Sequence, residues 1–281
     1  MGKIHVWQSN EWVLSFMYYP VIYSLLRVLP LIYNEEIDFK LTEQKYEDLS
    51  ENDVVIWVGV YEPSINELKQ INKKIHTIHF NLEPFINDSG YDEIWTYSRY
   101  MYNLYKDLNK NVRFIPIICD AYAPKTIYSK NNYNIQLTFI GNLSQPYGRS
   151  EKVKLIQESG VEINEICNLW NDEDYNLFII NNTHIYLNIN KSDTKALPSV
   201  RINKLLSHKC IIISEYTNAI DEELYSDLVF FKNLDEIGDF YKGLLEKSVE
   251  ELENVANTIY QRFSNRFNLE NAIQLIQTHK P

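Results

Sequence analysis

Two oppositely charged residues, Arg201 and Glu215, lie in the segment with the strongest chemical signal, "LPSVRINKLLSHKCIIISE" at 197–215. Its pattern predicts a helix over 199–208 that begins near Ser199, followed by a buried strand over 209–215. Backbone N–H groups at a helix start bind phosphate groups, and Arg201 opposes the helix dipole unless an anion is bound there. The residues therefore favour a diphosphate site, and the alternative is a simple pairing of Arg201 with a nearby carboxylate such as Asp193.

The end of the predicted strand offers groups that bind hydroxyls. Glu215 at this end could accept hydrogen bonds from a ribose, while its alternative roles are a helix cap or a surface charge. Ser214 precedes it, and the neighbouring strand at 184–190 ends in Asn188 and Asn190. In open α/β sheets ligands bind at the carboxyl ends of the strands. We therefore expect these polar side chains to lie near one ligand.

A second candidate for anion binding is "TFIGNLSQPYGRSEK" at 138–152. Gly141 and Asn142 directly follow a predicted strand, and Arg149 stands just before a predicted helix. A glycine lets the backbone approach a phosphate closely, and the arginine adds positive charge. The segment lacks the GK[ST] of a P-loop and the GxGxxG fingerprint. An ordinary turn with a solvated arginine is the alternative.

In the first half of the chain, "HTIHFNLEPF" at 76–85 places His79, Asn81 and Glu83 at a strand end. A carboxylate there could take the proton from an attacking hydroxyl, so Glu83 is the predicted general base. His79 is better explained as a half-buried strand residue. By the same strand-end argument, Gln8, Ser9 and Asn81 are the residues expected to bind an acceptor.

Metal chemistry has little support in the sequence. Asp172 and Asp174 have the D-x-D spacing that can hold a divalent cation, but they precede a predicted helix, where Asp174 as an N-cap explains the pattern. The spacing of His and Cys residues matches no zinc motif. We therefore predict neither a metal nor a cofactor.

The elements that must position these residues alternate between strands and helices, which predicts an α/β protein with parallel sheets. The 281 residues suffice for about two domains, and the 45% hydrophobic content indicates a globular chain. Predicted strands lie at 3–8, 37–42, 53–61, 75–83, 93–98, 112–119, 135–142, 161–166, 184–190, 209–215 and 227–231. Predicted helices lie at 14–29, 64–74, 150–160, 174–182, 199–208, 234–247, 248–263 and 266–277.

Composition narrows the class of partner. The net charge of −11 argues against a nucleic-acid-binding protein. The apolar stretch 16–33 carries Arg27 and two prolines, so we expect a buried helix and no membrane span. Three cysteines, Cys119, Cys167 and Cys210, fit a reducing compartment, and no signal-peptide pattern begins the chain. A cytoplasmic location is expected, which would be the host cytoplasm if the protein is viral.

Taken together, the segments "IHFNLEPF", "YDEIWTYSRYMYNL", "FIGN…YGR", "IYLNIN", "RINKLLSHKCIIISE" and "FFKNLDEIGDFYKGLLE" resemble the GT-B glycosyltransferases. They run in family order over most of 76–263, and the likeness is to the compact single-chain type of bacteria and large DNA viruses. The chain departs from the family pattern in having Lys204 where many members have a ribose-binding Glu. It also has Pro198 where the compact type often has a Glu before its Arg.

The resemblance implies two Rossmann-like domains that face each other across a cleft, and a metal-independent transfer of sugar from a nucleotide-sugar to a hydroxyl of a glycan or other acceptor. UDP- or GDP-sugars are the expected donors. The implied domains are an acceptor domain (1–120), a linker (121–134), a nucleotide-sugar domain (135–263) and a C-terminal helix (264–281) that packs back on the first domain. The expected donor-binding residues are Gly141, Asn142, Arg149, Asn190, Ser199, Arg201, Lys204, Ser214 and Glu215.

Two other functions fit the same residues. One is a GT-B-like scaffold that binds a glycan or a partner without turnover, which the Lys204 departure favours. The other is a different nucleotide-binding α/β enzyme, such as a phospho-sugar epimerase, because the overall layout is similar. Ligand binding separates the glycosyltransferase and the scaffold from the epimerase-like enzyme, and turnover separates the glycosyltransferase from the scaffold.

Overall fold

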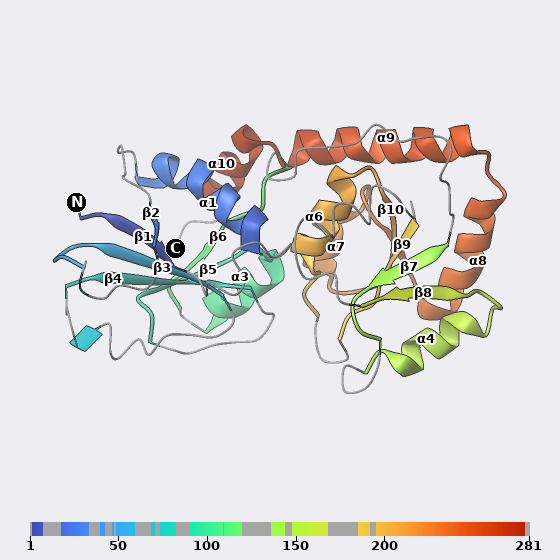
Figure 1. The fold of residues 1–281 in the computed structure, drawn as a ribbon, viewed down its shortest axis with the longest axis horizontal. Helices are drawn as coiled ribbons and strands as arrows, with labels where there is room; N and C mark the ends of the chain where they lie inside the picture. The colour runs from blue at the N-terminus through green and yellow to red at the C-terminus, as the bar shows by residue number, and fades with distance from the viewer. Residues whose placement is uncertain are drawn as a thin grey trace. The chain divides into compact units, whose positions relative to one another are not determined.

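A computed structural model gives the fold of the chain (Figure 1). It describes residues 2–7, 18–33, 40–42, 47, 49–59, 69–70, 74–82, 90–108, 110–119, 136–143, 148–167, 185–191 and 195–278. The chain divides into two compact units. Unit 1 comprises Met1–Ala121 and Leu269–Pro281, and unit 2 comprises Tyr122–Asn268. Most of the predicted helix at 64–74, the predicted helix at 174–182 and the linker 121–134 lie outside the described residues.

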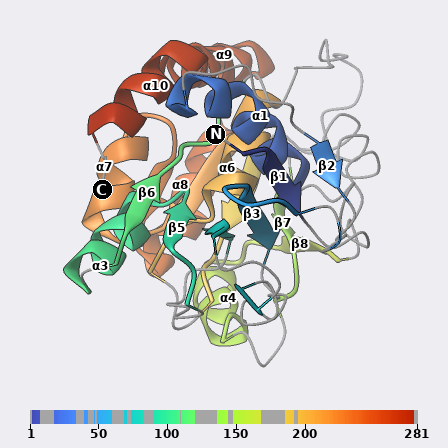
Figure 2. The same ribbon diagram turned by 90° about the vertical axis from the view of Figure 1, so that its left-hand side faces the viewer.

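Unit 1 contains a six-stranded parallel sheet in the order β2-β1-β3-β4-β5-β6. Figure 2 looks across this sheet, with β6 and β2 at its two edges. Every residue of β3 is buried, which is why its sequence is a continuous apolar run and does not alternate. The strands are β1 (Ile4–Trp7), β2 (Lys40–Thr42), β3 (Val54–Gly59), β4 (His76–Asn81), β5 (Glu93–Thr96) and β6 (Val112–Phe114).

Helix α1 (Tyr18–Tyr33) continues past the point where we expected it to end. The prediction ended the helix at residue 29, one residue before Pro30, and a proline in a helix interior removes one helical hydrogen bond and costs about 3 kcal/mol. The helix nevertheless includes Pro30. Its buried side chains Val21, Leu25 and Val28 are fully covered, and the helix packs against α10 (Leu269–Thr278). Burial of this face outweighs the local cost of the proline.

The C-terminal helix belongs to unit 1, as the fold prediction has it. Helix α9 (Val249–Arg266) ends unit 2, and after a short turn α10 contacts α1 and β6 of unit 1 (Figure 1). The buried residues Ala272 and Ile276 of α10 form its inner face. Helix α10 thus completes the core of the first unit.

The strand prediction at 112–119 was too long, because β6 ends at Phe114. The following residues Ile115, Ile117 and Ile118 are buried although they are not in a strand. The backbone N–H of Ile118 donates to the side-chain oxygen of Ser24 on α1 at 3.1 Å. An apolar run in the sequence indicates that its residues are buried, but buried residues need not belong to a strand, and those after Phe114 do not.

Unit 2 contains a five-stranded parallel sheet in the order β11-β10-β9-β7-β8. Its strands are β7 (Leu137–Ile140), β8 (Ile163–Ile166), β9 (Ile185–Asn188), β10 (Ile211–Glu215) and β11 (Phe230–Lys232). Its other helices are α4 (Ser150–Gln157), α6 (Ser199–Ser207), α7 (Ala219–Tyr225) and α8 (Leu234–Leu245). Inward-facing residues of β7, β9 and β10 form the core with α4 and α8.

Two short helices escaped the sequence analysis, and both begin with a side-chain cap. Ser98 accepts a hydrogen bond from the backbone N–H of Met101 at the start of α3 (Arg99–Asp107). Asn218 accepts one from Asp221 at the start of α7. Ser and Asn are favoured N-caps, so the caps were readable in the sequence.

Candidate functional site

The carboxyl edge of the unit 2 sheet contains a topological switch point between β7 and β9. From β7 the chain moves outward to β8 on one side, and it returns to β9 on the other side. Ligands of open α/β sheets bind where the strand order reverses in this way. The two segments that leave this point are Gly141–Asn142 after β7 and Ile189–Asn190 after β9. Both were predicted from the sequence as ligand-binding segments.

Arg149 joins these two segments. Its Nε donates to the carbonyl oxygen of Ile189 at 3.0 Å, and its Nη1 donates to the carbonyl oxygen of Asn142 at 2.9 Å. The side chain is buried, and its guanidinium carbon lies 5.3 Å from the centre of the Phe139 ring. Arg149 is therefore a fixed cation at the switch point and not a solvated arginine in a turn.

Arg201 brings a second cation to the same ring. Its guanidinium carbon lies 5.6 Å from the centre of the Phe139 ring. A buried aromatic ring in contact with two guanidinium groups concentrates positive charge in a chain with a net charge of −11. Phe139 was missed in the sequence analysis because it lies in the middle of a predicted strand, where an aromatic residue is usually a core residue.

The start of α6 adds partial positive charge of its own. Its N-cap residue is Pro198, which has no side chain able to cap the helix, and its first turn contains no acidic residue. The first N–H groups of a helix have no partner within the helix. The hydroxyl of Ser199, the first residue of α6, is buried and has no hydrogen-bond partner among the described residues. A helix start of this kind favours an anion.

Glu215 has a partner that we did not anticipate. Lys152 on α4 donates to both carboxylate oxygens of Glu215 at 2.9 and 3.0 Å, and the backbone N–H of Asn190 donates to Oε1 at 2.6 Å. Lys152 also reaches the carbonyl oxygen of Asn190 at 3.3 Å. Glu215 is thus neither a helix cap nor a surface charge. Lys152 stands one helical turn after Arg149, a spacing that could have drawn attention to it.

Ser214 and Asn188 form a buried contact beneath Glu215. The amide nitrogen of Asn188 donates to Oγ of Ser214 at 2.9 Å and approaches Oδ1 of Asn190 at 3.4 Å. The Ser214 hydroxyl donates to the carbonyl oxygen of Glu215 at 2.8 Å. Within the described part of the chain, Oδ1 of Asn188 is buried without a donor. These residues hold the ends of β9 and β10 together.

Lys204 is buried, with 2% of its surface exposed. It lies on α6, the helix that packs against α9 and β10. The hydroxyl of Ser207 donates to its carbonyl oxygen at 2.7 Å, and Nδ1 of His208 lies 2.8 Å from the same oxygen. The sequence predicted Lys204 as a donor contact, and the structure places it in the packed interior.

In unit 1, the predicted residues fall into two groups. Gln8, Ser9 and Glu83 lie outside the described residues, as do Asp172 and Asp174 in unit 2. Asn81 ends β4, is buried, and donates from Nδ2 to the hydroxyl oxygen of Tyr105 at 2.8 Å.

His79 is a core residue, and it is more deeply buried than predicted. Only 1% of its surface is exposed, its Nε2 lies 3.0 Å from the carbonyl oxygen of Gly59, and its ring stacks on Tyr91. Burial lowers the pKa of His79, because the charged imidazolium would lose its hydration, and the bond to Gly59 only partly offsets this effect.

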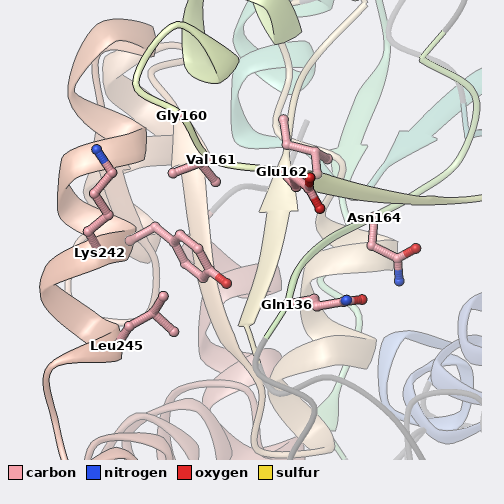
Figure 3. A pocket seen from close by; sticks show the side chains of 9 residues that line it. Gln136, Gly160, Val161, Glu162, Asn164, Lys242 and Leu245 are labelled. Carbon is pink, nitrogen blue, oxygen red and sulfur yellow. The ribbon is translucent and has the colours of Figure 1, made fainter.

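The amino edge of the unit 2 sheet carries a separate hollow of about 470 Å³. Figure 3 shows Lys242 and Leu245 of α8 on one side and Glu162, Asn164 and Gln136 on the other. Because all strands are parallel, this edge is opposite to the one that carries Arg149 and Glu215. We therefore treat the carboxyl edge as the candidate site.

Among the described residues, no group of three or more His, Cys, Asp or Glu side chains is placed to hold a metal ion. In the same part of the chain, no helix combines the length and the apolar character that crossing a membrane requires.

The fold defined by these two parallel-sheet units is that of the GT-B glycosyltransferases. A DNA-modifying β-glucosyltransferase, solved with and without uridine diphosphoglucose, is similar at a TM-score of 0.61 and 11% identity, with 99% of each chain covered. The Anabaena HepE protein in complex with UDP gives 0.59 and 9%, again with 99% of each chain covered. An α1,3-fucosyltransferase gives 0.52 and 10%, covering 99% of this chain and 90% of the other. No protein-family model matches the sequence, and neither does any curated protein.

Proposed function

We propose that the protein is a glycosyltransferase that moves a sugar from a nucleotide-sugar to a hydroxyl group of a glycan or another acceptor, without a metal ion. The observation that carries the proposal is the placement of Arg149 and Arg201 against the Phe139 ring, beside the uncapped start of α6. These groups supply positive charge where the diphosphate of the donor would leave. Transfer is accelerated when such groups are already in place as the negative charge develops.

Each residue of the site has a role in this proposal. Arg201 and the N–H groups at the start of α6, with Ser199, would bind the diphosphate. Gly141 and Asn142 would allow close approach of the donor, since Gly141 has a φ of +138° that other residues rarely adopt. Arg149 is held by two carbonyl groups and would fix the two loops around the donor.

The remaining predicted contacts are Asn190, Ser214, Glu215 and Lys204. Glu215, beside the diphosphate site, would accept hydrogen bonds from ribose or sugar hydroxyls through the lone pairs that Lys152 and Asn190 do not use. Ser214 and Asn190 would position Glu215, and the buried charge of Lys204 would add to the positive potential at α6. On the acceptor side we keep Glu83 as the general base and Gln8, Ser9 and Asn81 as acceptor contacts.

UDP is the first donor nucleotide to test, because UDP or uridine diphosphoglucose is bound in structures of similar fold. One of these proteins modifies DNA, but we propose a glycan or a small hydroxyl compound as the acceptor here. A net charge of −11 gives no cationic field to attract a nucleic acid. We also propose that the protein acts in the cytoplasm.

The decisive experiment is a thermal-shift screen of the full chain with UDP, GDP, CMP and their sugar conjugates, with and without EDTA. A ligand at about one hundred times its Kd stabilises the native state by about 2.7 kcal/mol. We expect one nucleotide to raise Tm with or without EDTA. Arg201→Ala should abolish the shift. The matched control is Arg262→Ala, which changes an exposed arginine of unit 2 whose Nε lies 3.9 Å from Asp227.

The outcomes separate the candidate functions. A shift with one nucleotide-sugar, followed by release of the free nucleotide when an acceptor is added, supports the transferase. A shift without turnover supports a second candidate, a GT-B-like binding scaffold, which the existing pairing of Glu215 with Lys152 favours. No shift with any nucleotide would overturn the donor site.

A further inference from the structure

The outer edge of the unit 2 sheet carries a pair of aromatic rings, one exposed and one half-buried, that the donor site does not use. Tyr216 follows directly after β10, and Phe231 lies in the edge strand β11. Their ring centres are 6.2 Å apart and their planes differ by 22°. In this nearly parallel arrangement the rings stack, so that Phe231 supports the ring of Tyr216.

Tyr216 is 52% exposed, the largest exposed fraction among the described large apolar side chains. It borders a hollow of about 460 Å³ that also includes Glu222, Glu223 and Lys232. An exposed aromatic residue by itself needs no explanation, but one that is stacked, beside a hollow and surrounded by polar groups resembles a binding surface.

The backbone on both sides of Tyr216 is fixed. Before it, the Glu215 side chain is held by Lys152. After it, the backbone N–H of Thr217 donates to Oε1 of Glu222, and Asn218 caps α7. These contacts hold Tyr216 at the surface, where its ring stacks on Phe231. A preorganised ring loses little entropy when a ligand binds.

We propose that Tyr216 and Phe231 form a binding platform for a neutral saccharide. A pyranose ring has one face made largely of C–H groups, which packs on a flat aromatic surface, while its hydroxyls point outward. Carboxylates accept hydrogen bonds from neighbouring hydroxyls, and Glu222 and Glu223 stand at the rim of the platform. Ser226 lies at the same rim, where its hydroxyl donates to the carbonyl oxygen of Glu223 at 3.2 Å.

The charge of the rim distinguishes this ligand from a nucleotide. The rim carries the carboxylates of Glu222 and Glu223, whereas the ammonium group of the neighbouring Lys232 lies 4.7 Å from the centre of the Phe240 ring on α8. A phosphate would be repelled by this rim, whereas the hydroxyls of a neutral sugar would not. The platform is thus chemically distinct from the cationic surface at Arg149 and Arg201, and its binding does not require transfer activity.

The test uses the full chain and four neutral trisaccharides, built from glucose, N-acetylglucosamine, mannose or galactose, in the presence of saturating UDP. Saturation-transfer NMR should identify at least one that binds, with the C–H protons of one ring face receiving the strongest signal. Titration should show that Tyr216→Ala weakens binding by about tenfold, a loss of about 1.4 kcal/mol, whereas Tyr216→Phe retains it. Leu245→Ala is the matched control, since Leu245 is 43% exposed and lines the hollow at the opposite edge of the sheet.

Three results would overturn the platform. The first is no binding of any trisaccharide at about 10 mM, which corresponds to less than about 3 kcal/mol of affinity. The second is equal binding by the wild type and Tyr216→Ala. The third is loss of saccharide binding when UDP is added, which would place the sugar in the donor site. The UDP-dependent rise in Tm is measured on the same variants and should be unchanged in Tyr216→Ala, so failure of the platform and failure of the donor site remain distinguishable.

Discussion

Lys152 and Glu215 form an ion pair at the candidate site, although 63 residues separate them in the sequence. Lys152 extends from the first turn of α4, and Glu215 ends β10. The pair is mostly buried, with side-chain exposures of 22% and 11%. It ties the helix that follows β7 to the end of a strand two places away in the sheet.

Removal of this lysine should destabilise unit 2. Lys152→Met keeps the length of the side chain but leaves the buried carboxylate of Glu215 with the Asn190 N–H as its remaining partner among the described residues. Breaking one side of a buried pair costs 3–5 kcal/mol, and partial exposure of Lys152 reduces our expectation to about 2 kcal/mol. Urea unfolding followed by far-UV circular dichroism measures the change.

Lys154→Met provides the comparison, because Lys154 lies on the same helix but is exposed. It should change the free energy of unfolding by less than about 0.5 kcal/mol. Equal effects of the two substitutions would mean that the ion pair contributes nothing beyond a surface charge. The double variant Lys152→Met, Glu215→Gln should recover part of the loss, since it no longer buries an unpaired charge.

A glycine in α8 is required for the packing of that helix against α4. A Cβ added to Gly238 would lie 1.9 Å from Oγ and 2.6 Å from Cβ of Ser159. Rotation of the serine cannot move its Cβ, so Gly238→Ala should destabilise the protein by about 1–3 kcal/mol. Gly243 in the same helix has open space around it, so Gly243→Ala should stabilise by up to about 1 kcal/mol.

Thermal unfolding of the two alanine variants tests this prediction directly. If Gly238→Ala unfolds at the same temperature as the wild type, α8 does not pack as closely on Ser159 as described. A further check is Gly238→Ala combined with Ser159→Gly, which removes the clashing atoms. The two changes should be strongly non-additive, because Gly238→Ala introduces a clash that Ser159→Gly removes.

Asp53 makes the stability of unit 1 dependent on pH. Burial alone would raise the pKa of this carboxyl, but hydrogen bonds from the N–H of Ser50, from His5 and from the N–H of Lys3 outweigh it and hold the pKa below its usual value. Its stabilisation is therefore complete above the unfolded-state pKa of about 3.9, and it is lost as the pH falls through the lower pKa of the folded state.

Asp53→Asn should lower stability at pH 7 by about 2 kcal/mol and flatten the decline on acidification. Unfolding followed by tryptophan fluorescence between pH 7 and acid reports mainly on unit 1, which contains four of the five tryptophans, among them the buried Trp7, Trp57 and Trp95. Asp107→Asn changes an exposed carboxylate of the same unit and should leave the pH profile unaltered. An unchanged profile in Asp53→Asn would exclude Asp53 as its source.

Lys209 adopts a left-handed backbone conformation, with a φ of 58°, in the turn between α6 and β10. This conformation costs a residue with a side chain about 1–2 kcal/mol. Glycine avoids that cost, but it loses more chain entropy on folding, which cancels part of the gain. Lys209→Gly should therefore stabilise unit 2 by about 0.5–1 kcal/mol. Asn52→Gly, at a φ of 68°, should gain less, because Asn tolerates this conformation. A loss of stability in Lys209→Gly would show that the contact of its ammonium with the Tyr260 ring matters more.

Much of the fold was predictable because each unit follows simple local rules. Continuous apolar runs such as 54–58 signal strands buried on both faces, and their alternation with helical spacing predicts parallel sheets. Arg149, Arg201 and Glu215 could be selected because strand ends and helix starts are visible in the sequence. The predicted end of α1 at residue 29 came too early, since the helix packs against α10, which is far away in the sequence.

The sequence by itself determined which residues stand at the carboxyl ends of the strands and which carry charge. Only the tertiary structure decided which of them meet: Arg149 and Arg201 at the ring of Phe139, and Lys152 at Glu215. The physical reason is that the order of strands in the sheet differs from their order in the chain. Burial then selects, among many possible charge pairs, the few whose partners can replace the water that each group loses.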